Sequence, residues 1–183
     1  GRRRALEALE QVLEEARNTY EFYGIGLYDQ EGKALVLNGD IYDSFAGEEW
    51  YGLLKETDNL TIADPVVTEN YVGIPVGVPV KSEGETTVYM VGLYKYDMLS
   101  DVLESIHIGE SGMALIINED GKIVGHPEEE IVQQELNIYE LDTADSAHQI
   151  FDHMVTRETG SGEGMFKGQD AYVSYCPVRG TRW

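Results

Sequence analysis

The chain has 183 residues, of which 42% are hydrophobic, enough to build the core of one large domain or two small ones. Its 13 basic and 34 acidic residues give a formal net charge of −21. Such a surface repels nucleic-acid phosphates and anionic lipids, which argues against both as partners. No apolar run approaches the roughly 20 residues that cross a bilayer.

The first half of the sequence alternates helical and strand-like segments. The predicted elements are a helix over 5–22, strands over 24–28 and 33–37, a helix over 47–56, and strands over 66–69, 71–80 and 88–94. Apolar residues recur at steps of three and four in the first helix, and Gly24 is expected to end it. Pro75 and Pro79 are expected at a sheet edge, a strand end or a bulge. This order is typical of a PAS-like α+β module, in which a sheet and helices enclose a pocket.

The second half partly repeats the first. A helix is predicted from Asp97 to Ile106, with strands over 113–118 and up to Pro127, a helix over 144–159, and strands over 164–166 and 171–178. The turn Asp29-Gln30-Glu31-Gly32-Lys33 recurs as Asn118-Glu119-Asp120-Gly121-Lys122, and Pro79-Val80 recurs as Pro177-Val178. We therefore predict an N-terminal helix (1–23), a complete PAS-like module (24–105) and a second, incomplete one (106–183).

The residue inventory offers little for catalysis. Cys176, the single cysteine, excludes an internal disulfide framework, and its strand-like surroundings predict a buried free thiol. His, Cys, Asp and Glu residues nowhere show the spacing of a metal site, and no phosphate-binding loop or nucleophile motif occurs. We expect no metal, no cofactor and no enzymatic activity.

The run IGESGMALIINEDGKIVGHP, from Ile108 to Pro127, resembles the signature of double Cache domains. Further matches follow the same order along the chain: Glu49-Trp50-Tyr51, Ala63-Asp64-Pro65-Val66, Val78-Pro79-Val80 and the segment from Tyr175 to Trp183. The resemblance implies an extracytoplasmic sensor with a membrane-distal and a membrane-proximal PAS-like module. Such sensors occur in bacterial chemoreceptors, histidine kinases and cyclic di-GMP enzymes.

The resemblance also implies a small-molecule site in the distal module. The expected ligand-binding residues are Tyr42, Glu48, Trp50, Tyr51, Asp64, Thr68, Tyr71 and Tyr94. Amino-acid sensors of this family carry an arginine two positions before the tryptophan, where this chain has Glu48. None of the matched residues could form two hydrogen bonds to a ligand carboxylate, as an arginine does. A cation or a flat polar ring is therefore favoured over an amino acid as the ligand.

Each candidate also has a purely structural interpretation. Trp50 and Tyr51 suit the core of an amphipathic helix as well as a pocket wall. Glu48 suits a solvated helix position, and Asp64, before a proline, suits a turn. The tyrosines on strands, such as Tyr71 and Tyr94, can face the core without contacting a ligand.

The favoured function is therefore small-molecule sensing by the extracytoplasmic part of a bacterial transmembrane receptor, a methyl-accepting chemotaxis protein in the first instance. The alternatives are the sensor domain of a histidine kinase or cyclic di-GMP cyclase, or an intracellular PAS-like regulator. The full-length receptor is expected to be membrane-anchored and homodimeric.

Overall fold

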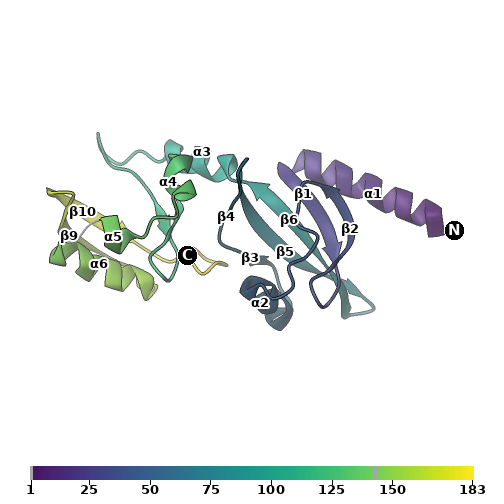
Figure 1. The fold of residues 1–183 in the computed structure, drawn as a ribbon. Helices are drawn as coiled ribbons and strands as arrows, with labels where there is room; N and C mark the ends of the chain where they lie inside the picture. Colours follow the sequence, from purple (N-terminus) through teal and green to yellow (C-terminus); the bar gives the residue numbers. More distant parts are fainter. Residues whose placement is uncertain (1, 142–143) are drawn as a thin grey trace. The chain divides into compact units, whose positions relative to one another are not determined.

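A computed structural model describes residues 2–141 and 144–183, and the chain divides into two compact units. The first unit ends at Tyr96, and the second runs from Asp97 to Trp183. The first contains α1 (Arg2–Thr19), β1 (Phe22–Tyr28), β2 (Ala34–Gly39), α2 (Glu49–Thr57), β3 (Thr61–Ile62), β4 (Val66–Val67), β5 (Val72–Ser82) and β6 (Glu85–Lys95). In Figure 1, α1 lies along β1 and β2, whereas α2 lies next to β3 and β5.

The first unit is built on one antiparallel sheet of six strands in the order β2-β1-β6-β5-β3, with β4 also paired to β5. Its longest hairpin joins β5 to β6 through Glu83 and Gly84, both with positive φ, the backbone that a two-residue hairpin turn requires. Helices around a single antiparallel sheet confirm the predicted α+β fold.

The prolines of β5 lie in a strand that is only partly covered on one side. The carbonyl oxygen of Pro75 accepts a hydrogen bond from the Ala63 amide at 2.9 Å, so the ring nitrogen of Pro75 also faces the β3–β4 side. On that side β4 pairs with Val72 and Gly73 and β3 with Val76 and Gly77, which leaves Pro75 in the gap between them. A proline is tolerated there because no neighbouring strand needs its missing amide hydrogen.

The first helix ends earlier than expected. Gly24 was expected to end it, but α1 stops at Thr19, and Glu21 takes the left-handed conformation with φ of 58°. Gly24 is instead a buried residue of β1. The helix ends without a glycine because Glu21 occupies the left-handed position that a glycine usually takes.

The core of the first unit is strongly aromatic. One cluster of buried side chains comprises Tyr28, Phe45, Tyr51, Leu54, Tyr89 and Val91, with Ala34, Ile41 and Trp50 packed against them. These residues come from β1, β6, α2 and the segment before α2, so this cluster fills the space between the sheet and α2. The aromatic rings meet mostly edge-on or tilted, the arrangement that their charge distribution favours.

The second unit has shorter elements. They are α3 (Asp97–Ser105), β7 (Ile116–Ile117), β8 (Ile123–Gly125), α4 (Glu129–Gln133), α5 (Ile138–Leu141), α6 (Asp145–Val155), β9 (Gly160–Phe166) and β10 (Gln169–Tyr175). Helix α3, which we expected at the end of the first module, belongs to this unit. Its described strands pair as two separate ribbons, β7 with β8 and β9 with β10.

The turn that recurs in the sequence has the same hydrogen bonds in both units. The side-chain oxygen of Asp29 accepts from the amides two and four residues further on, at 3.0 and 2.8 Å. Asn118 does the same at 3.0 and 2.9 Å. The recurrence in the sequence therefore reflects one turn structure used twice.

The cysteine prediction is wrong. Cys176 is a free thiol, but it is exposed. It comes directly after Tyr175, the last residue of β10, and most side chains of β10 are exposed as well. The alternating sequence pattern predicted that one face of this strand would be buried, but no side chain of β10 is fully buried.

Candidate functional site

One end of the six-stranded sheet carries a small opening. Because neighbouring strands are antiparallel, β2 ends and β5 begins at this end. The opening, which we call the Asp40 pocket, has a volume of about 210 Å³ and is lined by Asp40, Ile41, Tyr42, Thr68, Asn70 and Tyr71. The structure thus brings together three of the predicted site residues, from two segments about 30 positions apart.

Asp40 and Tyr71 form the polar pair of this pocket. The Asp40 carboxylate lies next to Tyr71 and interacts with its phenol group. Burial, and after it the interaction with Asp40, raises the pKa of Tyr71 to about 12, so the phenol stays protonated at neutral pH. Tyr42, 42% exposed, borders the same opening. The pocket therefore combines one carboxylate with two phenol rings.

Thr68 gives the wall next to Tyr71 a fixed shape. Its hydroxyl oxygen accepts from the Tyr71 amide at 3.0 Å and donates to the Tyr71 carbonyl oxygen at 2.9 Å. The backbone amide of Thr68 donates to the same carbonyl oxygen at 2.9 Å. These bonds close a tight turn before β5, so the backbone of Tyr71 is held in place before any ligand arrives.

A stacked pair of tyrosines connects this pocket to a second opening. The rings of Tyr23 and Tyr71 lie 3.9 Å apart at 19°. The Lys95 ammonium group lies 5.6 Å from the centre of the Tyr23 ring, within range of a cation–π contact. Tyr23 at the start of β1 and Lys95 at the end of β6 therefore extend the site beyond the Asp40 pocket.

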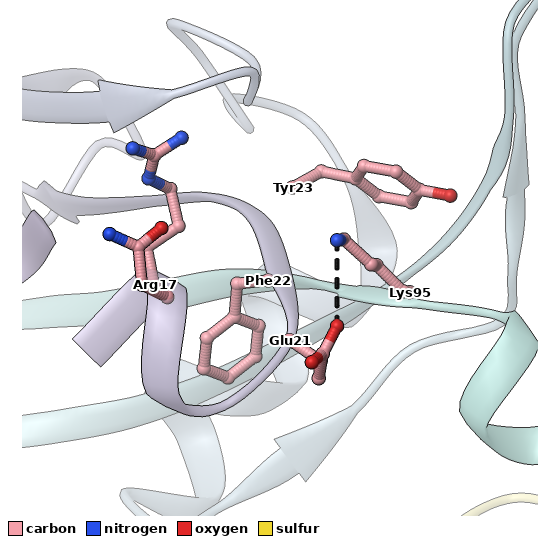
Figure 2. Close-up of a pocket in the computed structure, with 6 residues that line it drawn as sticks. Arg17, Glu21, Phe22, Tyr23 and Lys95 are labelled. Carbon is pink, nitrogen blue, oxygen red and sulfur yellow. Dashed lines mark ion pairs between the residues drawn. The ribbon is translucent and has the colours of Figure 1, made fainter. Parts of the chain in front are cut away.

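The second opening lies where α1 passes into β1, and we call it the Arg17 pocket (Figure 2). Its volume is about 310 Å³, and it is lined by Arg17, Asn18, Glu21, Phe22, Tyr23 and Lys95. The Lys95 ammonium group is 3.5 Å from the Glu21 carboxylate. The charges here are mainly positive, the reverse of the Asp40 pocket.

The predicted residues Trp50 and Tyr51 belong to the core cluster. Tyr51 is 2% exposed, and its hydroxyl group donates to the Asp29 carbonyl oxygen at 2.8 Å. Burial raises its pKa well above the ordinary range. Trp50 is half-buried and packs edge-on against Phe45, with ring centres 4.9 Å apart. The structure supports the interpretation of these two rings as core residues.

The other three predicted residues lie outside the Asp40 pocket lining. Glu48 is the exposed residue before the first turn of α2, and Asp64 is an exposed residue between β3 and β4. Successive side chains of a strand point to opposite faces, so Tyr94 lies on the face opposite Lys95. There it packs edge-on against Phe22, with ring centres 5.6 Å apart.

Three residues of the site are not among those that the sequence predicts: Asp40, Tyr23 and Lys95. Each lies at the end of a strand, where periodicity says little about which way a side chain points. A usable signal exists, because the ends of β1, β2, β5 and β6 meet at one edge of an antiparallel sheet. Polar and aromatic residues at those ends are therefore candidates.

The arrangement is suited to binding a small molecule. The Asp40 pocket offers a carboxylate, phenol hydroxyl groups and aromatic faces, which stabilise cations and flat rings. Among residues 2–141 and 144–183, no three metal-ligating side chains gather at one place. In the same part of the chain, no helix is both long and apolar enough to cross a membrane.

An antiparallel sheet with covering helices and a small polar pocket at one sheet end defines a PAS-like binding module. The family model for the double Cache type, described as a Cache domain, matches residues 3–183. The chain therefore belongs to the Cache domain family. Cache domains are ligand-binding sensor domains and are typically extracytoplasmic parts of membrane receptors.

Solved structures show the same fold at low sequence identity. The ligand-binding domain of the Pseudomonas aeruginosa amino acid chemoreceptor PctB, in complex with L-Gln, has a TM-score of 0.68 and 18% identity, over 95% of this chain and 69% of that chain. The extracellular domain of the putative histidine kinase mmHK1S-Z2 has a TM-score of 0.71 and 18% identity, over 95% and 77%. A domain of a sensory box/GGDEF family protein from Vibrio parahaemolyticus has a TM-score of 0.60 and 14% identity, over 96% and 73%.

Proposed function

We propose that this chain is the small-molecule sensing part of a bacterial chemotaxis receptor, and that its ligand binds in the Asp40 pocket. The observation that carries the proposal is the Asp40–Tyr71 pair, which stands with Tyr42 and Thr68 at one opening. In this proposal the domain binds its ligand without chemical change. The receptor is anchored in the membrane and works as a homodimer.

The proposed ligand carries a positive charge or a flat polar ring. None of the six side chains that line the Asp40 pocket is basic, so a carboxylate entering it would meet Asp40 without a compensating cation. An amine would pair with Asp40 and lie against the rings of Tyr42 and Tyr71. The ligand acts on the receptor only through a difference in its affinity for two states of the domain.

The test is calorimetric titration of the 183-residue chain with benzylamine, cytosine and L-glutamine. Benzylamine or cytosine is expected to bind more tightly than L-glutamine. Asp40→Asn is expected to weaken benzylamine binding about tenfold, because a charge-assisted contact is lost. The matched control Glu56→Gln removes an exposed charge from α2 and is expected to change nothing. Tight L-glutamine binding that survives Asp40→Asn would overturn the ligand assignment.

A histidine kinase or a GGDEF-type cyclase is the second candidate for the receptor. It is favoured by the similarity to the mmHK1S-Z2 and Vibrio parahaemolyticus domains. The two receptor classes differ in output, so the discriminating assay uses the full-length receptor in membranes. Ligand-dependent control of the chemotaxis kinase supports the first candidate, and ligand-dependent autophosphorylation or cyclic di-GMP synthesis supports the second.

A further inference from the structure

The Arg17 pocket surrounds the place where α1 gives way to the sheet. The chain reverses at Glu21, whose carbonyl oxygen accepts from the Lys95 amide at 3.1 Å. This bond ties the turn to the end of β6. Figure 2 shows Arg17 on one side of Phe22 and the Lys95–Glu21 pair on the other. The opening is therefore framed by backbone that hydrogen bonding already fixes.

The charge of this pocket is opposite to that of the protein. The chain carries 34 acidic against 13 basic residues, yet the lining holds two cations, Arg17 and Lys95, against the single carboxylate of Glu21. The Glu21–Lys95 pair is half exposed, with side-chain accessibilities of 50% and 36%, so water screens its attraction. The net charge of +1 on these three groups matches one monovalent anion.

Arg17 supplies a donor that lacks an acceptor. Its Nε atom is buried and has no hydrogen-bond partner. The arginine stem lies against Gly39, where an added Cβ would come within 2.6 Å of Arg17 Cδ, so the stem can approach only because residue 39 is a glycine. Nε is closed off from the opening, so the terminal N–H groups of the guanidinium are the donors that a carboxylate would meet.

The wall between the two cations is aromatic. Phe22 and Tyr23 line the opening and are both half-buried, so they leave ring surface accessible from it. Apolar ring surface next to cationic donors suits an anion with an organic body better than a fully hydrated inorganic ion.

We infer that the Arg17 pocket binds a small organic monocarboxylate, which is attracted by the charges of Arg17 and Lys95 and lies with its body against the aromatic wall. This site is separate from the Asp40 pocket, which takes ligands of the opposite charge. The two openings share the Tyr23–Tyr71 stack as a wall. Carboxylate binding in the Arg17 pocket does not depend on the proposed sensing function.

The test is an NMR titration of the isotope-labelled chain with sodium benzoate at 150 mM ionic strength, with sodium chloride as the blank. Amide shifts are expected at Phe22, Gly39 and Lys95. Arg17→Gln and Lys95→Met are each expected to weaken benzoate binding about tenfold, because each removes a charged donor. Glu21→Gln is expected to strengthen it, because the repelling carboxylate is gone.

Matched controls separate this site from general charge effects. Arg3→Gln on the exposed face of α1 and Lys55→Met on α2 remove the same charges outside the pocket and are expected to leave benzoate binding unchanged. If Arg17→Gln perturbs folding, the benzoate titrations of Lys95→Met and Glu21→Gln decide the result. Equal effects of the control variants, or shifts that sodium chloride reproduces, would overturn the inference.

Discussion

The role of Tyr51 gives the sharpest test of where the core ends and the ligand site begins. The family resemblance implies that Tyr51 lies in the ligand site, whereas in the structure it is a buried residue of α2 whose hydroxyl group donates to the Asp29 carbonyl oxygen. The variant Tyr51→Phe removes this hydroxyl and keeps the ring. We expect it to lower the stability of the first unit and to leave benzylamine affinity unchanged.

The expected loss follows from the hydrogen bonds around Asp29. One intramolecular hydrogen bond contributes a net 0.5–1.5 kcal/mol or so, and a buried partner left unsatisfied adds roughly 1–3 kcal/mol. The Asp29 carbonyl oxygen also accepts from the Gly32 amide at 3.0 Å, so it keeps a partner in the variant. The added penalty is therefore small, and the loss should be about 1 kcal/mol.

Urea unfolding followed by tryptophan fluorescence measures this loss. Trp50 packs against Tyr51, with ring centres 5.6 Å apart, whereas Trp183 belongs to the second unit. A Trp183→Phe background therefore makes the signal report on the first unit. With m of about 2 kcal/mol per molar urea, the midpoint should fall by about 0.5 M. Tyr20→Phe is the control, because Tyr20 is 63% exposed.

Two outcomes would refute this reasoning. An unchanged midpoint would mean that the Tyr51 hydroxyl group contributes nothing to the fold. A large loss of benzylamine affinity with an unchanged midpoint would mean that Tyr51 lines the ligand site, as the family resemblance implied. The urea midpoint and the benzylamine affinity are measured independently, so together they distinguish a core residue from a ligand-site residue.

Two further variants test the packing and the electrostatics of the first unit. Gly77→Ala would place a Cβ atom 2.5 Å from Leu54 Cδ2, so we expect a loss of about 1–3 kcal/mol in urea unfolding; an unchanged midpoint would mean that α2 shifts freely. Asp58→Asn tests the hydrogen bonds from Lys81 and Thr86, which hold the pKa of Asp58 below its usual range. A lowered folded-state pKa stabilises the fold above the ordinary carboxyl pKa, and this contribution is lost as pH falls through the folded-state value. The variant should therefore be less stable than the natural chain at pH 7, with a gap that narrows towards pH 3; a gap independent of pH would contradict the assignment.

Elements with a strong local signal could be predicted from the sequence. The turn at Asp29 recurs at Asn118 because an Asp or Asn side chain organises its own backbone, and local chemistry of this kind is visible in sequence. The sequence also predicts the β5–β6 hairpin and the helices α2 and α3, because hydrophobic spacing is likewise a local signal. The prediction for Gly24 is wrong because a glycine near a helix end can either end the helix or belong to the next element. Here it belongs to strand β1.

The candidate site was harder to predict because it depends on which strand ends meet. The sequence predicts Tyr42, Thr68 and Tyr71 but not Asp40, since only the strand order β2-β1-β6-β5 brings Asp40 next to Tyr71. Lys95 was missed in favour of Tyr94, one position away. A shift of one residue along a strand exchanges the two faces of the sheet, and local sequence cannot decide between them.

The sequence and the structure both favour a positively charged ligand, but for different physical reasons. From sequence this preference depended on Glu48, which stands where amino-acid sensors carry an arginine. In the structure Glu48 is exposed at the start of α2, in water that screens its charge. Asp40 is instead held against Tyr71 at a pocket whose six lining residues include no cation. A carboxylate placed next to aromatic rings in this way attracts an amine more strongly than a solvated glutamate does, so Asp40→Asn should weaken amine binding and Glu48→Gln should not.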